Sequence, residues 1–253
     1  MIGVPPTALT PAPGPSPDAW AFTPWQLGVR AWWRRCGGLA AAVPLTGLLV
    51  ALPVFLEAPW VRQAPFSAAL FTGVLVAVGL LLAGQERPGL RRSGELLVGF
   101  SASWLAGAVF WGWARQYPIC HLPIEAFALP LALGGLQGRW RLACGFYLGS
   151  LLGTAATDAA IAATGLMPLW PLALTAGAAD ASDLLQTAAN TVFQPGPFLI
   201  VCGFGLALTQ LSRWLWQRGP VAQIAATALA TTIAVDALFL AVALLAPRLS
   251  GLI

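Results

Sequence analysis

The sequence predicts an all-α fold, a polytopic membrane helix bundle, and three observations lead to it. Asp, Glu, Lys and Arg make up 9% of the 253 residues, against about 25% in soluble domains. The hydrophobic fraction is 58% and the mean hydropathy is +0.77. The apolar residues gather in seven runs, and about 20 apolar residues in a helix cross roughly 30 Å of hydrocarbon. A disordered chain, a coiled coil and an ordinary water-soluble enzyme are therefore excluded.

The spans are taken in chain order. They are predicted at 37–56, 66–84, 96–114, 119–136, 142–165, 197–215 and 220–246. The fourth is the least regular, because it contains Pro123 and Pro130 as well as two ionisable residues. With seven spans, 10 of the 13 arginines fall on one side of the membrane, whereas omitting the fourth span gives 7 against 6. The positive-inside rule then predicts a cytoplasmic N-terminus and a periplasmic or lumenal C-terminus.

The segments outside the spans are assigned next. Residues 1–36 are expected to form a proline-rich, flexible cytoplasmic tail that ends in a membrane-edge segment. This stretch lacks the early basic residue and apolar core of a signal peptide. Residues 37–253 are expected to form a single membrane domain. Apolar residues at helical spacing predict an outer amphipathic helix over 182–194, with Asp180 or Ser182 as its N-cap.

The basic residues and the cysteines limit the partners. All 13 basic residues are arginines, scattered in twos and threes, whereas nucleic-acid binding needs a clustered basic face with stacking aromatic residues. The expected partner is the lipid bilayer, together with other membrane subunits in an accessory role, and no nucleic acid. The cysteines, which form no C-x-x-C motif, are expected to pack as apolar residues, with a Cys120–Cys202 disulfide as the alternative: Cys36, Cys120, Cys144 and Cys202.

Small residues predict how the helices pack. Lipid tails are as apolar as leucine, so membrane helices associate through close backbone approach at small side chains. Two spans carry such residues at every fourth position: Gly145, Gly149 and Gly153 in the fifth, and Gly99, Ser103 and Gly107 in the third. These stripes are expected to form helix contacts.

Chemistry is expected at ionisable residues in or next to the spans, because each is costly in a bilayer unless it is paired or hydrated. No G-x-x-x-x-G-K-[ST], H-E-x-x-H or G-x-S-x-G motif occurs. The sequence therefore assigns no catalytic residue, metal ligand or cofactor, and it favours a role other than catalysis. The binding candidates are Glu57, Arg62, Arg115, His121, Glu125, Asp158 and Asp236. We expect all of them in the outer half of the bundle, with Glu57 at the outer edge and no ionisable residue in the inner half.

Spacing groups some of these residues on shared helix faces. Three pairs lie four residues apart: His121 and Glu125, Thr154 and Asp158, and Thr232 and Asp236. We expect the threonine hydroxyls to hydrogen-bond the carboxylates or to widen a polar cavity. Gln186 and Asn190 of the outer helix could close such a cavity from above.

The acidic residues leave three hypotheses open. In the first, Arg115, Arg62, His121 or bound protons neutralise Glu125, Asp158 and Asp236, and the group only fixes helix positions. In the second, the acidic residues form an outward-facing pocket for a cation, a proton relay or an amine-bearing solute. In the third, a metal-dependent intramembrane hydrolase uses His121 and the three carboxylates as ligands, although no family-strength spacing supports it.

Four segments carry a resemblance to a known family. They are PVFLEAPWVR at 53–62, LLVGFSASWLAGAVFWGW at 96–113, HLPIEAFALP at 121–130 and GFYLGSLLGTAATD at 145–158. Together they resemble a cyanobacterial integral-membrane family, domain of unknown function 3120, over roughly residues 40–246. The resemblance implies a multi-pass protein in the plasma or thylakoid membrane of a photosynthetic bacterium. It implies no activity, but its segments include five of the candidates: Glu57, Arg62, His121, Glu125 and Asp158.

The sequence thus leads to three functional expectations. The first is transport or binding of a small solute or cation through an outward-facing acidic pocket. The second is an accessory or assembly subunit of a membrane complex, for example a photosynthetic one. The third is an intramembrane enzyme. Neither a substrate nor an oligomeric state follows from the sequence.

Overall fold

The computed structural model describes Leu39 and residues 41–245, and this part of the chain is helical and contains no strand. Seven helical segments are long and apolar enough to cross a membrane: Ala42–Gln63, Pro65–Ala83, Pro88–Ala114, Pro118–Gly135, Arg141–Ala163, Pro195–Trp216 and Pro220–Leu245. The predicted all-α polytopic bundle is therefore confirmed, and the chain is an integral membrane protein. The described helices belong to one compact unit that begins at Leu39. The predicted tail, Cys36 and Arg248 lie outside the described residues.

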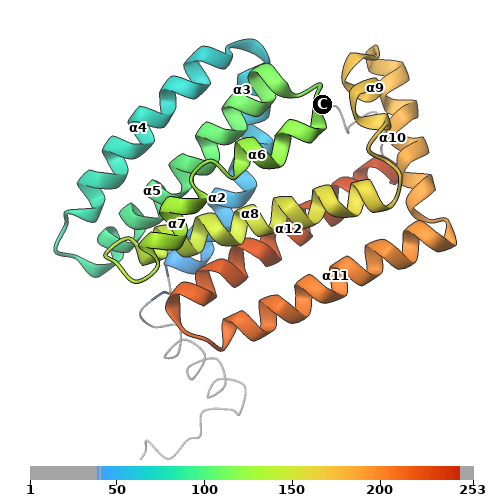
Figure 1. The fold of residues 1–253 in the computed structure, drawn as a ribbon. Helices are drawn as coiled ribbons and strands as arrows, with labels where there is room; N and C mark the ends of the chain where they lie inside the picture. Colours follow the sequence, from blue (N-terminus) through green and yellow to red (C-terminus); the bar gives the residue numbers. More distant parts are fainter. Residues whose placement is uncertain (1–38, 40, 246–253) are drawn as a thin grey trace, which may run out of the picture. The chain divides into compact units, whose positions relative to one another are not determined.

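The spans differ in regularity (Figure 1). The first joins α2 (Ala42–Leu52), the π-helical turn η2 (Pro53–Glu57) and α3 (Ala58–Gln63). The second is α4 (Pro65–Ala83), and the third joins α5 (Pro88–Val109) to the π-helical turn η3 (Phe110–Ala114). The fourth consists of the 3₁₀ turn η4 (Pro118–Cys120), α6 (His121–Glu125) and α7 (Leu129–Gly135). The others are α8 (Arg141–Ala163), α11 (Pro195–Trp216) and α12 (Pro220–Leu245), with α9 (Leu169–Thr175) and α10 (Ala178–Val192) between α8 and α11.

Proline marks the start of four of these helices, because the first turn of a helix does not need the N–H that proline lacks. The residues are Pro65, Pro88, Pro195 and Pro220, at the starts of α4, α5, α11 and α12. The third span therefore begins at Pro88 and not at residue 96, and Glu95 lies inside it, buried. The expectation that the inner half holds no ionisable residue is wrong for Glu95.

Close backbone contact joins the central helices. α5 packs against α4 and α8, and α8 packs against α12. A β-carbon added at Gly99 would lie 2.5 Å from the carbonyl oxygen of Ala143, and one at Gly149 would lie 2.6 Å from that of Ala225. These distances leave no room for a side chain, as in other tightly packed membrane helices. Gly145 and Gly153 also face α12, whereas Gly107 faces Glu57 and Ser103 is half-buried.

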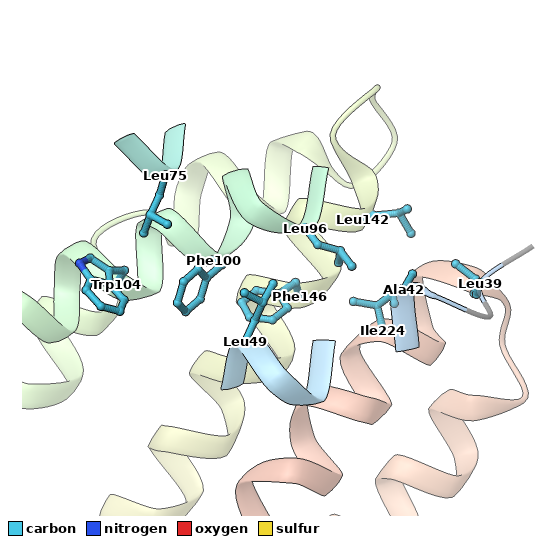
Figure 2. Packing of buried hydrophobic residues seen from close by; sticks show 10 residues of the cluster. All are labelled: Leu39, Ala42, Leu49, Leu75, Leu96, Phe100, Trp104, Leu142, Phe146 and Ile224. Atoms are coloured by element: carbon cyan, nitrogen blue, oxygen red, sulfur yellow. The ribbon is translucent and has the colours of Figure 1, made fainter. Parts of the chain in front are cut away.

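A cluster of buried hydrophobic residues, three of them aromatic, joins α2, α4, α5, α8 and α12 (Figure 2). Phe100 lies between Trp104 on its own helix and Phe146 of α8, with ring centroids 5.7 and 6.2 Å apart and edge-to-face geometry. The indole Nε1 of Trp104 donates a hydrogen bond to the carbonyl oxygen of Ala68 at 2.8 Å, so its buried polar atom is satisfied. Along α5 this apolar centre lies between Glu95 and the turn η3.

The predicted amphipathic helix is present as α10 and is longer than predicted, while its position on the outer side stays a prediction. It begins at Ala178 with Gly177 at its N-cap, so neither Asp180 nor Ser182 caps it. α10 packs against α9, α11 and α12. Gln186 and Asn190 are both exposed, so the structure does not show them closing a cavity. The alternative Cys120–Cys202 disulfide is not formed, because both cysteines are free.

Candidate functional site

The fourth span is broken next to Glu125, the last residue of α6. Ala126 and Ala128 leave the helical conformation, and Pro130 cannot donate a backbone hydrogen bond in the first turn of α7. The buried hydroxyl of Tyr147, on α8, donates to the carbonyl oxygen of Glu125 and accepts from the amide of Ala128 at 3.1 Å. One side chain therefore satisfies backbone groups on both sides of the break, as a membrane interior requires.

The imidazole of His121 lies between two carboxyl groups. Its Nδ1 is 2.9 Å from Oδ2 and 3.1 Å from Oδ1 of Asp158, and its Nε2 is 4.0 Å from Oε1 of Glu125. An ionised carboxylate can only accept hydrogen bonds, so Nδ1 carries the proton whenever Asp158 is ionised. The three side chains are only 11% (His121), 13% (Glu125) and 14% (Asp158) exposed. Each ring nitrogen of His121 thus faces a carboxyl group of its own.

Aromatic rings enclose this imidazole. The His121 ring lies 4.2 Å from the Phe110 ring, 6.3 Å from that of Trp111 and 5.8 Å from that of Trp170, between centroids. Trp170 comes from α9 and stacks on Trp111 at 5.7 Å. Its Nε1 donates a hydrogen bond to the carbonyl oxygen of Arg115 at 2.9 Å. The imidazole is thus surrounded by aromatic rings from the third span and from α9.

Asp236 of α12 is the exposed member of the acidic group. The hydroxyl of Thr157 donates to its Oδ2 at 2.7 Å. The predicted partner, Thr232, instead donates to the carbonyl oxygen of Ala228 at 3.2 Å, and within the described residues Thr154 forms no side-chain hydrogen bond with Asp158. Sequence reasoning missed Thr157, although a polar residue next to Asp158 inside an apolar span was a usable signal.

Glu57 lies deeper than expected. The first span continues to Gln63, so Glu57 is inside it and not at the outer edge, and its side chain is 1% exposed. It is the last residue of η2, where the amide of Ala58 bonds to the carbonyl oxygen of Pro53 in the i to i+5 pattern. Such π-turns often occur at functional sites. The carboxyl group lies directly against α5 at Gly107.

The expected arginine partners are not at the site. Arg62 is exposed and Arg115 is half-buried. Among the described residues the only ion pairs are those of His121 with Asp158 and Glu125. Neutralisation by arginine, one route that the first hypothesis allowed, is therefore not seen in this part of the chain, whereas the contacts with His121 that it also allowed are present.

The carboxyl groups instead form a series. His121 links Asp158 to Glu125, and the hydroxyl of Thr157, next to Asp158 in the sequence, bonds to Asp236. Glu57 lies against Gly107 of α5, three residues before Phe110, whose ring packs on that of His121. His121 is the one basic side chain in direct contact with these carboxyl groups in the described chain. The group draws on four spans, the first, fourth, fifth and seventh.

The side chains of His121, Glu125 and Asp158 are largely buried, whereas Asp236 is exposed, and the outward-facing pocket stays a prediction. An open groove does occur, between α2, α11 and α12, but none of the acidic candidates lines it. Nor, in the described residues, do three His, Cys, Asp or Glu side chains lie together in a group that could hold a metal ion. The geometry is thus suited to proton transfer between neighbouring side chains.

Comparison with known proteins assigns the chain to a family. A family model described as Protein of unknown function (DUF3120) matches residues 46–244, well over half of the chain, and the chain belongs to this family. No curated protein and no solved structure matches the chain. The match confirms the family that the four segments resemble, while the cyanobacterial origin stays a prediction.

Proposed function

We propose that this member of the DUF3120 family is a proton-coupled transport protein in which His121 passes a proton between Asp158 and Glu125. The bridging imidazole carries the proposal, because its two nitrogens lie 2.9 and 4.0 Å from these carboxyl groups. An imidazole can accept a proton on one nitrogen and release one from the other. The bond to Asp158 is formed, and transfer to Glu125 requires the 4.0 Å separation to close to hydrogen-bond distance by movement of the side chains.

The exposure of the acidic residues gives the path a direction. Asp236 is exposed and hydrogen-bonded to Thr157, next to Asp158. A proton that arrives at Asp236 would pass to Asp158, then to His121 and then to Glu125. The predicted topology places Asp236 toward the periplasmic or lumenal side, so we propose that the path opens there. The solute whose movement is coupled to this proton is small or cationic, in keeping with the acidic surroundings.

The test is proton conduction by the purified full-length protein in lipid vesicles. A pH-sensitive dye is trapped inside, and a potassium diffusion potential drives protons inward. We expect the wild-type protein to conduct protons and Asp158→Asn to conduct at least about tenfold less, because an amide cannot take up a proton. His121→Phe, which keeps a ring among the aromatic residues, should show the same loss.

Asp183→Asn is the matched control, because it makes the same chemical change at an exposed position of α10. Its conduction should equal that of the wild-type protein. Wild-type conduction no faster than that of protein-free vesicles would refute the proposal. Normal conduction by both Asp158→Asn and His121→Phe would also refute it.

A further inference from the structure

Glu57 has a buried carboxyl group that its surroundings do not satisfy. The residue is 1% exposed, and within the described chain its Oε1 has no hydrogen-bond partner. A buried ionised carboxylate with no opposite charge beside it is far too costly to persist, so the group must carry a proton or hold a cation. Few buried polar atoms in proteins are left unsatisfied, and each one requires an explanation.

The helices around Glu57 supply no countercharge. η2 packs against α2, α3 and α5. α2 has no charged residue, and Arg62 of α3 is exposed and forms no ion pair in the described structure. On α5 the charged residues are Arg91, Arg92 and Glu95, all in the first part of the helix. Glu95 is separated from Gly107, the residue that faces Glu57, by about 18 Å along the helix axis. Gly107 and Phe110 are three residues apart, and the ring of Phe110 packs on His121, whose Nε2 is 4.0 Å from Oε1 of Glu125. Glu125 is therefore the acidic residue at the same end of the bundle as Glu57.

The space around the carboxyl group distinguishes a proton from a metal ion. A β-carbon at Gly107 would lie 3.1 Å from both Oε1 and Oε2 of Glu57, so the carboxyl group rests directly on the α5 backbone. A bound metal ion needs several oxygen ligands. The described residues provide no group of three acidic or other ligating side chains at this position. A proton needs only the carboxyl group itself.

We propose that Glu57 is a second proton-binding residue, which stores a proton inside the bundle and exchanges it with Glu125. In the transfer the O–H bond of the Glu57 carboxylic acid breaks and a new O–H bond forms on the Glu125 carboxylate, which leaves Glu57 ionised. Proton transfer through His121 then removes the proton from Glu125 or returns one to it. The inference extends the proposed function, since it gives the path of His121 an inner end.

Infrared spectroscopy of the full-length protein in lipid tests whether Glu57 holds the proton. A protonated carboxyl group gives a C=O stretching band that moves when exchangeable hydrogen is replaced by deuterium. We expect this band at neutral pH in the wild-type protein and its loss in Glu57→Gln. Glu95→Gln is the matched control, a second buried glutamate on a neighbouring helix, and it should keep the band. A band of full intensity in Glu57→Gln would overturn the proposal.

Gly107→Ala provides a second measurement if Glu57→Gln does not fold. The added methyl group would press on both carboxyl oxygens, so the frequency of the band should change. Gly73→Ala, at a position where a β-carbon meets no described atom within 4 Å, should leave the frequency unchanged. An unchanged frequency in Gly107→Ala would show that the proton is not on Glu57.

Proton conduction in vesicles tests the exchange with Glu125. Glu57→Gln should lower it at least tenfold, and Glu57→Asp, which keeps a carboxyl group, should restore part of it. Normal conduction in Glu57→Gln together with a loss in Asp158→Asn would overturn this inference and leave the proposed function standing. Normal conduction in both variants would overturn both this inference and the proposed function.

Discussion

The two ends of α5 hold buried glutamates in opposite electrostatic surroundings. Near its start, Glu95 interacts with four arginines: Arg91, Arg92, Arg139 and Arg141. Near its end, Glu57 of the neighbouring span lies against Gly107, and its charged neighbour is another acid, Glu125. Nearby arginines favour the anionic form of a buried glutamate and oppose the effect of burial, whereas a second acid nearby favours the protonated form. Under our proposal, the countercharge decides which buried acid takes part in proton transfer.

Two glycines of α5, Gly94 near Glu95 and Gly107 beside Glu57, differ in the atoms that pack against them. A β-carbon at Gly94 would lie 2.5 Å from the carbonyl oxygen of Gly79 and would also collide with the amide of Ala83, both in α4. At Gly107 the nearest atoms belong to the flexible side chain of Glu57. The arginine-rich end of α5 is therefore joined to its neighbour by backbone, and the other end by a movable carboxyl group.

The largest expected effect is that of Gly94→Ala. The methyl group must push α4 and α5 apart, because the atoms it meets are backbone, and overpacking of this kind costs about 1–3 kcal/mol. Thermal unfolding in mild detergent should show a clearly lower midpoint than that of the wild-type protein. Gly73→Ala, in an open position of α4, should unfold at the wild-type temperature. Equal midpoints for Gly94→Ala and Gly73→Ala would show that this end is not closely packed.

The second prediction compares Glu95→Gln with Glu57→Gln. The first change removes a negative charge near four arginines and should destabilise the protein by roughly 1 kcal/mol. The second replaces a protonated, neutral carboxyl group with a neutral amide of similar shape and should cost less. The measurement is the unfolding midpoint of each variant at neutral pH and low salt. If Glu57→Gln lowered the unfolding midpoint more than Glu95→Gln, the proposed charge states of the two glutamates would be contradicted.

The smallest expected effect is that of Gly107→Ala. Its methyl group would lie 3.1 Å from both carboxyl oxygens, so the Glu57 side chain must shift by a few tenths of an ångström. We expect a loss of less than about 1 kcal/mol, and recovery of most of it when Glu57→Asp shortens the side chain. A double-mutant cycle on the unfolding free energies measures this coupling. Strictly additive effects would mean that the two residues do not touch in the folded protein.

Hydropathy was sufficient for the fold but not for the helix ends. The seven spans could be predicted because each needs a long apolar run. The first was expected to end at residue 56, because charge and prolines follow it, yet the π-turn η2 lets the helix continue past Glu57 to Gln63. The third was expected to start at residue 96, because the preceding residues are charged, yet Pro88 begins the helix. Hydropathy measures the cost of burial and does not report backbone continuity.

The candidate site was predictable only along single helices. His121 and Glu125 were placed on one face by their spacing, and the structure has them 4.0 Å apart. The contacts of His121 with Asp158 and of Thr157 with Asp236 join residues that are distant in the sequence, so no local pattern indicates them. The packing of Trp111 and Trp170 around His121 likewise joins residues that are distant in the sequence. The sequence indicated the ionisable groups, and tertiary packing selected their partners.

The hydroxyl of Tyr147 has a consequence for the order in which the chain enters the membrane. The break between α6 and α7 exposes backbone groups that lipid cannot satisfy, and Tyr147 of the next span supplies the missing contacts. The fourth span alone would leave these groups unpaired, so it gains a stable position only when the fifth is present. We therefore expect the two to be inserted together as a helical hairpin during synthesis, with the tyrosine as the contact that completes it.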